Sequence, residues 1–170
     1  KDPAIAQNFA TSRSDDGQQI VGQPLIDPIS VPTEIAYQHH GEELEGIVFK
    51  APAMEVKWDI YAYGEWFYFV RSWTSDLIYQ VRRENTGASL VLTEILMPKS
   101  IGHDESQIAA QNVHSIMLTH AMGRVWPFHV PPAMHKSPGE EIALYLFSQF
   151  GSMATIATRE NTLKIALRNE

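Results

Sequence analysis

The ten residues from Glu65 to Thr74, Glu-Trp-Phe-Tyr-Phe-Val-Arg-Ser-Trp-Thr, constrain the fold of this chain more than any other stretch. The run is rich in aromatic residues and contains neither Gly nor Pro, which is typical of a strand covered on both faces. Alternation predicts two faces, which carry Trp66, Tyr68, Val70 and Ser72 on one side and Phe67, Phe69, Arg71 and Trp73 on the other. Arg71 is therefore expected among aromatic rings, where a guanidinium needs a carboxylate, a ring face or a bound anion.

Segments of strand character surround this run and are joined by short turns. We expect strands over 44–50, 56–63, 66–73, 77–82 and 89–97. Turns as short as Ser75-Asp76 leave no room for crossovers, so the strands should form an antiparallel meander. The 56–63 segment alternates apolar and polar residues, which predicts a strand with only one buried face. The preceding segment, 33–40, fits either a short helix or the start of a strand.

The second half of the chain changes to helical periodicity. One helix is predicted to begin at the capping residue Asp104 and to end at Gly123. A second is predicted to be capped by Ser137, with Pro138 in its first turn, and to end at Gly151. The segments 153–158 and 162–167 fit either weak strands or a frayed tail. Strands followed by helices indicate an α+β fold, an antiparallel β-meander of about five strands packed by two helices from the C-terminal half.

Residues 1–32 differ in composition from the rest of the chain. They are polar at first and then contain Pro24, Pro28 and Pro32, so we expect an extended, Pro-rich N-terminal arm. Residues 33–170 are then a single α+β domain of common size. The arm has two interpretations that the sequence leaves open: it packs on its own domain, or it reaches a partner, including a second copy in a homo-oligomer.

Charge and composition limit the classes of partner. The 170 residues carry a net charge of −7, which argues against nonspecific binding to nucleic acid or anionic membranes and suits a basic partner protein. No apolar run is long enough to span a bilayer. The chain contains no cysteine, which excludes disulfides, thiol nucleophiles and Cys-ligated metals and fits a reducing cytoplasm. We therefore expect a soluble, cytoplasmic protein.

Arg71 is the centre of the candidate site. One hypothesis is that Phe69 and Trp73 frame it as an anion-binding arginine. The alternative is a structural ion pair with Glu94 or Asp59 on a neighbouring strand. The candidate ligand- or partner-binding residues are Arg71, Ser72, Trp73, Thr74, Tyr61, Tyr63 and Glu94.

The stretch Gly64–Thr74, followed by Leu77-Ile78-Tyr79, resembles a short pattern in uncharacterised bacterial proteins. In that pattern Arg-Ser-Trp-Thr-Gly closes one strand of a hairpin, and Ile-Tyr recurs just after it. The matching positions here run from Arg71 to Thr74, and Ser75 stands where the pattern has Gly. The resemblance implies a bacterial accessory domain, in some cases associated with ADP-ribose-handling modules, and it assigns no catalysis.

Other motifs of chemistry are weak, so we expect neither a metal nor a cofactor. The adjacent His39 and His40 point in different directions on any regular element. His114 and His120 are separated by about 120° on a helix, unlike the i, i+4 pair of a zinc helix. The chain also lacks a Gly-x-Ser-x-Gly elbow and a phosphate-cradling loop.

These observations favour a non-enzymatic binding module, such as an immunity or inhibitor protein whose acidic charge steers a basic toxin or nuclease onto it. Two alternatives stay open. One is a hydrolase or transferase that holds an anionic, nucleotide-like (ADP-ribose-type) ligand with Arg71 and stacks it on Trp73. The other is a structural or assembly subunit that uses residues 1–32 to pack on its neighbour.

Overall fold

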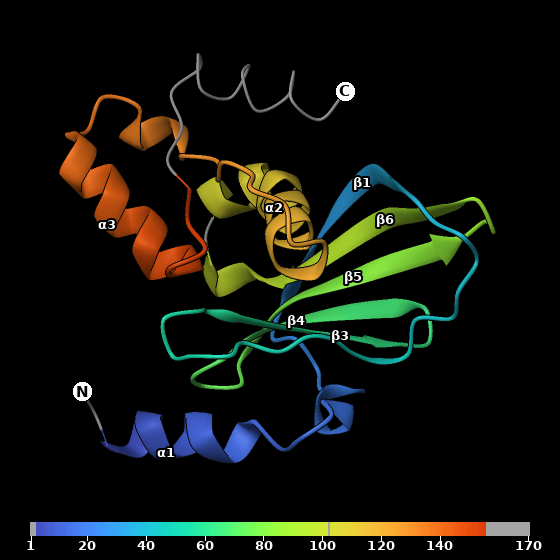
Figure 1. Ribbon diagram of the computed structural model, residues 1–170. Helices are drawn as coiled ribbons and strands as arrows, with labels where there is room; N and C mark the ends of the chain where they lie inside the picture. The colour runs from blue at the N-terminus through green and yellow to red at the C-terminus, as the bar shows by residue number, and fades with distance from the viewer. Residues whose placement is uncertain (1–2, 102, 156–170) are drawn as a thin grey trace.

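A six-stranded antiparallel sheet forms the centre of the protein (Figure 1). The computed structural model describes residues 3–101 and 103–155. The strands are β1 (Pro28–Gln38), β2 (Gly46–Phe49), β3 (Trp58–Tyr63), β4 (Trp66–Arg71), β5 (Leu77–Asn85) and β6 (Ser89–Pro98). Their order in the sheet is β1-β6-β5-β4-β3-β2, so β2 to β6 form the predicted meander. The α+β class is confirmed, but the sheet has six strands rather than about five.

The extra strand, β1, comes from residues predicted as extended arm and from the ambiguous segment after them. It pairs with β6 from Pro28 opposite Pro98 to Gln38 opposite Ser89, with an irregularity between Pro32 and Ile35. Proline lacks a backbone N–H but is tolerated on an edge strand, where one side of the ladder needs no donor. The prolines of this segment therefore lie in an edge strand, which still pairs with β6 on one side.

The expectation of an extended arm is wrong for its first part, because Pro3–Ser12 form helix α1. Proline suits the first turn of a helix, where its missing N–H has no intrahelical acceptor. A short 3-10 turn, η1 (Gln18–Ile20), follows. Strand β1 crosses the predicted boundary between residues 1–32 and 33–170, so both parts contribute to one strand. The division of the chain into an arm and a domain stays a prediction.

The two helices predicted in the C-terminal half are present. Helix α2 (His103–Ile116) continues into a π-helical turn, η3 (Met117–Ala121), and Gly123 follows with a φ of 64°. Helix α3 (Gly139–Phe150) begins after Pro138 and ends at Gly151, so the expected Ser137 cap is wrong. Short 3-10 turns η2 (Lys99–Ile101) and η4 (Pro132–Met134) complete the helical elements. None of the helices described is long and apolar enough to cross a bilayer.

Only residues 151–155 are described beyond α3, and they form no strand. Gly151 forms an isolated bridge with Val56, and residues 153–155 are not in a strand. The remainder of the predicted strands, 156–158 and 162–167, lies outside the described residues.

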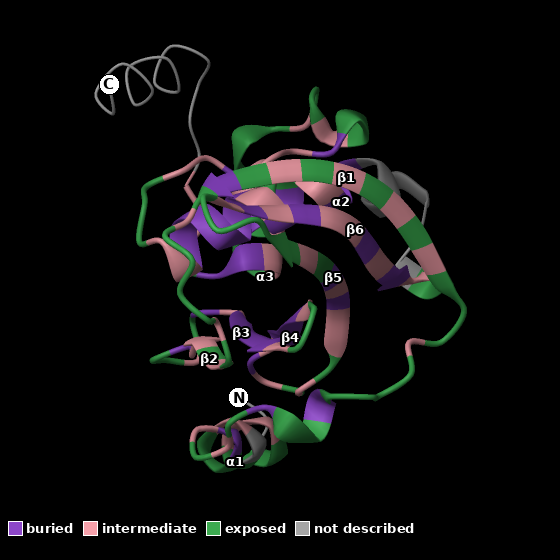
Figure 2. Ribbon diagram, turned by 90° about the vertical axis from the view of Figure 1, so that its right-hand side faces the viewer, coloured by how far each residue is buried: buried purple, intermediate pink, exposed green. Residues whose placement is uncertain are grey.

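Helices cover both faces of the β3–β4 part of the sheet, α2 and α3 on one side and α1 on the other (Figure 1). The core beneath α2 and α3 includes Phe67 and Phe69, both fully buried, as the alternation predicted. On the opposite face Ile20 packs against Tyr68 and Val70. Strand β3 is consequently buried on both faces, which corrects the prediction of a half-buried strand, and it is coloured as buried in Figure 2.

Candidate binding site

Arg71 lies on the face of the sheet that α2 and α3 cover. It is opposite Trp58 in the β3–β4 register. Its guanidinium carbon is 4.3 Å from the centroid of the Trp58 ring, whereas Phe69 and Trp73 were the framing rings expected from the sequence. Its Nη1 and Nη2 donate to the main-chain and side-chain oxygens of Gln149 at 2.5 and 2.6 Å. The aromatic frame and the C-terminal turn of α3 thus hold Arg71 in place.

Neither carboxylate proposed for an ion pair with Arg71 lies beside it. Asp59 is adjacent to Trp58 in β3 and therefore points to the opposite face, where it pairs with Arg13 at 2.7 Å. Glu94 is two strands away in β6, opposite Arg82, and accepts a hydrogen bond from Ser30 Oγ at 2.6 Å. The predicted ion pair of Arg71 with Glu94 or Asp59 is therefore wrong, and Arg71 contacts Gln149 and Trp58.

The two residues after Arg71 fasten the β4–β5 turn to the loop before β3. Ser72 is buried and donates through Oγ to the Val56 oxygen at 2.7 Å. The Trp73 indole donates to the Met54 oxygen, and Lys57 Nζ lies 3.1 Å above the Trp73 ring.

The end of this turn contains Ser75, the position at which the chain departs from the bacterial pattern. Thr74 is exposed and donates to the Asp76 carboxylate. Ser75 adopts a φ of 62°, a left-handed conformation that glycine accommodates most easily. The position occupied by Gly in the bacterial pattern is thus left-handed in this chain.

Tyr61 and Tyr63 lie on the other face and bind the N-terminal segment. Tyr61 is 2% exposed; its hydroxyl accepts from Lys50 Nζ at 2.6 Å and donates to Asp15 at 3.2 Å. Burial, aided by the charges of nearby Asp side chains, raises the pKa of Tyr61 above its ordinary value. The Tyr63 hydroxyl donates to the Asp16 oxygen at 2.8 Å.

The predicted site residues are therefore divided between two faces of the sheet. Arg71 contacts α3, whereas Tyr61 and Tyr63 contact the segment after α1, and Glu94 lies towards the β1 edge. The structure brings Arg71, Ser72, Trp73 and Thr74 together only as neighbours along one turn.

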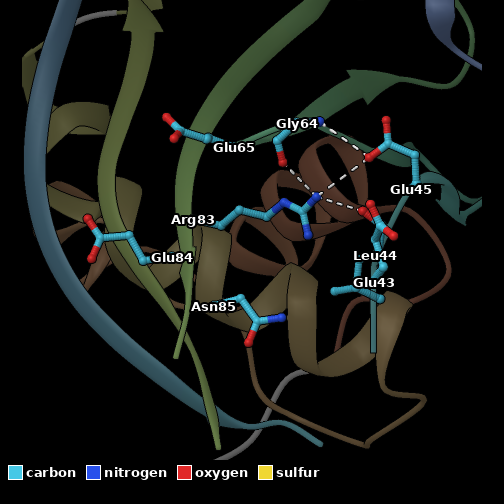
Figure 3. Close-up of a pocket in the computed structure, with 8 residues that line it drawn as sticks. All are labelled: Glu43, Leu44, Glu45, Gly64, Glu65, Arg83, Glu84 and Asn85. Atoms are coloured by element: carbon cyan, nitrogen blue, oxygen red, sulfur yellow. Dashed lines mark hydrogen bonds and ion pairs between the residues drawn. The ribbon is translucent and has the colours of Figure 1, made fainter. Parts of the chain in front are cut away.

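A different group of side chains surrounds a hollow of about 420 Å³ at the end of the sheet where the β3–β4 turn meets β5 (Figure 3). We call it the acidic hollow; it is lined by Glu43, Leu44, Glu45, Gly64, Glu65, Arg83, Glu84 and Asn85. Two of its glutamates precede β2, one lies in the β3–β4 turn and one is in β5. Three segments distant in sequence thus contribute glutamates to the lining of one depression.

Arg83 forms the floor of the acidic hollow. Its side chain is only 9% exposed, and Nη2 donates to the Leu44 and Gly64 oxygens at 2.6 and 2.7 Å. The Glu45 carboxylate is 3.9 Å from the same nitrogen (Figure 3). Burial lowers the pKa of Arg83 from its ordinary value, partly offset by the charges of Glu45 and Glu43. The buried Nε has no hydrogen-bond partner among the described residues.

The carboxylates outnumber the cations at this hollow. Glu65 pairs with Arg82 at 3.0 Å, and Glu45 is the only other glutamate of the hollow within ion-pair distance of a cation in the described chain. In Figure 3 the side chains of Glu65 and Glu84 extend away from the Arg83 guanidinium. Glu43 and Glu84 are exposed and form no ion pair within the part of the chain that the structure describes. The rim therefore keeps negative charge available for a ligand.

An aromatic hollow of about 660 Å³ continues from the acidic one. The two share Glu45, Gly64 and Glu65, and the second adds Tyr63, Trp66 and Tyr68 to its walls. The Arg82 guanidinium lies 5.9 Å from the Trp66 ring centroid and also pairs with Glu65. Carboxylates beside aromatic faces form a surface that attracts lysine and arginine side chains.

The sequence contained part of the signal for this site. The acidic run Glu42-Glu43-Leu44-Glu45 is visible in it, but its position beside Glu65 and Glu84 in the lining of one hollow depends on strand pairing.

No group of three or more His, Asp or Glu residues in the described ranges is arranged to hold a metal ion. Comparison with protein-family models, curated proteins and solved structures finds no match to this chain.

Proposed function

We propose that this protein is a binding module that recognises a basic partner protein through the acidic hollow and the adjoining aromatic hollow. The observation that carries the proposal is that four glutamates line a hollow in which the one lining cation among the described residues, Arg83, is already bonded to main-chain oxygens. A lysine or arginine of the partner would lie against the glutamates of this lining, while Trp66 offers a ring face beside them.

The net charge of −7 also favours a basic partner. An acidic surface accelerates encounter with a basic protein and makes the association rate fall with ionic strength. An immunity or inhibitor protein that covers a basic toxin or nuclease is one form of such a module. The alternative of an anionic ligand at Arg71 is less favoured, because Arg71 is engaged by Gln149 and Trp73 by Lys57 and Met54.

The test is the affinity of the full chain for decalysine and decaarginine peptides, measured by calorimetry at several salt concentrations. We expect the double variant Glu43→Gln/Glu84→Gln to bind about fivefold more weakly, since each exposed charge contact contributes up to about 1 kcal/mol. The matched control, Glu34→Gln/Glu140→Gln, changes two exposed glutamates outside the hollow and gives the same net charge.

The two variants separate a local site from a general charge effect. If both double variants weaken binding equally, the net charge and not the acidic hollow is responsible, and the proposal fails. Absence of peptide binding by the unmodified chain at low salt also refutes it.

A further inference from the structure

A third hollow, which shares no lining residue with the acidic or the aromatic one, lies between α2 and the segment that precedes α3. Its volume is about 400 Å³, within the range of small-molecule sites. The side chains that define it are Gln111, His114, Trp126, Phe128, His129 and His135, and we call it the histidine hollow. Three of the chain's seven histidines line it, one from α2 and two from the segment that precedes α3.

His114 is held in a fixed orientation. Its Nδ1 is 3.0 Å from the hydroxyl of Tyr37, and the two rings stack with centroids 5.7 Å apart at 18°. Trp126 packs edge-on against the same imidazole at 5.7 Å and 81°. Because Tyr37 in β1 is buried, the sheet determines the position of this imidazole, and its Nε2 is the ring nitrogen left for other contacts.

The other two histidines come from the proline-rich segment. His135 Nε2 is 3.0 Å from the Val130 oxygen, to which it donates. The His129 ring lies 6.5 Å from the His135 ring, at 72°. Pro127 and Pro131 restrict the backbone on either side of His129 and limit its rearrangement.

The chemistry of the walls defines what the hollow accepts. None of the described residues that line it is Asp, Glu, Lys or Arg, and burial lowers the pKa of His114. Those residues therefore add no permanently charged side chain to the walls. They present flat rings together with imidazole and amide groups that donate and accept hydrogen bonds.

We infer that the histidine hollow binds a planar heteroaromatic ring of the nucleobase class, stacked on Trp126 and hydrogen-bonded by His114 and Gln111. A saturated ligand would forgo the stacking, and a phosphate would find no fixed cation in the walls. The inference does not depend on the proposed recognition of a basic partner, which uses another part of the surface.

The experiment titrates the full chain at pH 7.5 with adenine, adenosine, AMP and cyclohexanol and follows the histidine imidazole resonances by NMR. We expect adenine and adenosine to shift the His114 signals, AMP to bind no more tightly than adenosine, and cyclohexanol to leave them unchanged. Trp126→Leu is expected to weaken adenine binding about tenfold, because stacking on an aromatic side chain supplies much of the affinity.

Two further variants keep the test decisive. Tyr37→Phe retains the stacked ring but removes the hydroxyl that orients His114, so it should weaken adenine binding several-fold while the fold is preserved. His40→Gln, at an exposed site outside the hollow, should have no effect. The inference is overturned if no nucleobase shifts the His114 signals, if cyclohexanol binds as well as adenine, if AMP binds much more tightly than adenosine, or if Trp126→Leu and Tyr37→Phe both bind normally.

Discussion

The ion pair between Arg13 and Asp59 offers the sharpest test of how the N-terminal segment is fixed to the sheet. Arg13 Nη2 and Nη1 donate to the two Asp59 oxygens at 2.7 and 3.1 Å, and the Ala51 N–H donates to Asp59 at 2.8 Å. The Asp59 side chain is 3% exposed, whereas that of Arg13 is 23% exposed. Removal of Arg13 would therefore leave a buried carboxylate with one main-chain donor.

We expect Arg13→Met to lower the free energy of unfolding by about 3 kcal/mol. Breaking a buried pair by removing one partner typically costs about 3–5 kcal/mol, and the partial exposure of Arg13 favours the lower end because water can reach the site. For a chain of this length the corresponding fall in Tm is about 6–12 °C. Urea unfolding followed by circular dichroism measures the change directly.

Two comparison variants test the reasoning. Adding Asp59→Leu to Arg13→Met removes the orphaned charge and should recover most of the loss, less about 1 kcal/mol for the Ala51 N–H left without an acceptor. Lys50→Met breaks the more exposed Lys50–Asp15 pair and should cost about 1 kcal/mol or less. If Arg13→Met costs no more than Lys50→Met, or the double variant is the least stable of the three, the buried pair does not have the role assigned to it.

Two further predictions concern a glycine contact and a buried histidine. Gly17 has a φ of 86°, and a Cβ there would lie 2.4 Å from the Tyr61 ring, whereas Gly22, with a φ of 80°, has no atom within 4 Å of such a Cβ. Gly17→Ala should therefore destabilise the fold by about 1–3 kcal/mol more than Gly22→Ala in urea unfolding; equal losses would show that the Tyr61 contact is easily relieved. Burial lowers the pKa of His120 to about 4. The unfolded chain binds a proton at this residue near pH 6.5, so its contribution is complete above that pH and is lost as the pH falls towards 4. His120→Gln should reduce the slope of stability against pH between these values, and an unchanged slope would contradict the assignment.

Local pattern was sufficient for much of the sheet and helices. The alternation of Trp66 to Arg71 correctly placed Phe67 and Phe69 on one face and Tyr68 and Val70 on the other, because side-chain direction in a strand repeats every two residues. Short turns required antiparallel neighbours for the same geometric reason. Gly123 and Gly151 correctly marked the ends of their helical segments.

The partners of individual side chains could not be obtained in this way. Arg71 was expected to meet Asp59 or Glu94, yet Gln149, far away in sequence, provides its hydrogen-bond acceptors. Likewise, Pro28 and Pro32 indicated an unpaired arm until the position of β1 at the sheet edge made their missing N–H groups harmless.

The sequence by itself determined the class of fold, which follows from the periodicity of apolar residues. It also determined the acidic character of the protein, which follows from the sum of its charges. Only the tertiary structure decided that Glu43 and Glu84 share a hollow and that His114 meets Trp126. Those meetings depend on which strands pair and which helix packs on them. These contacts join residues that are far apart in sequence, and the local periodicity of the sequence does not specify them.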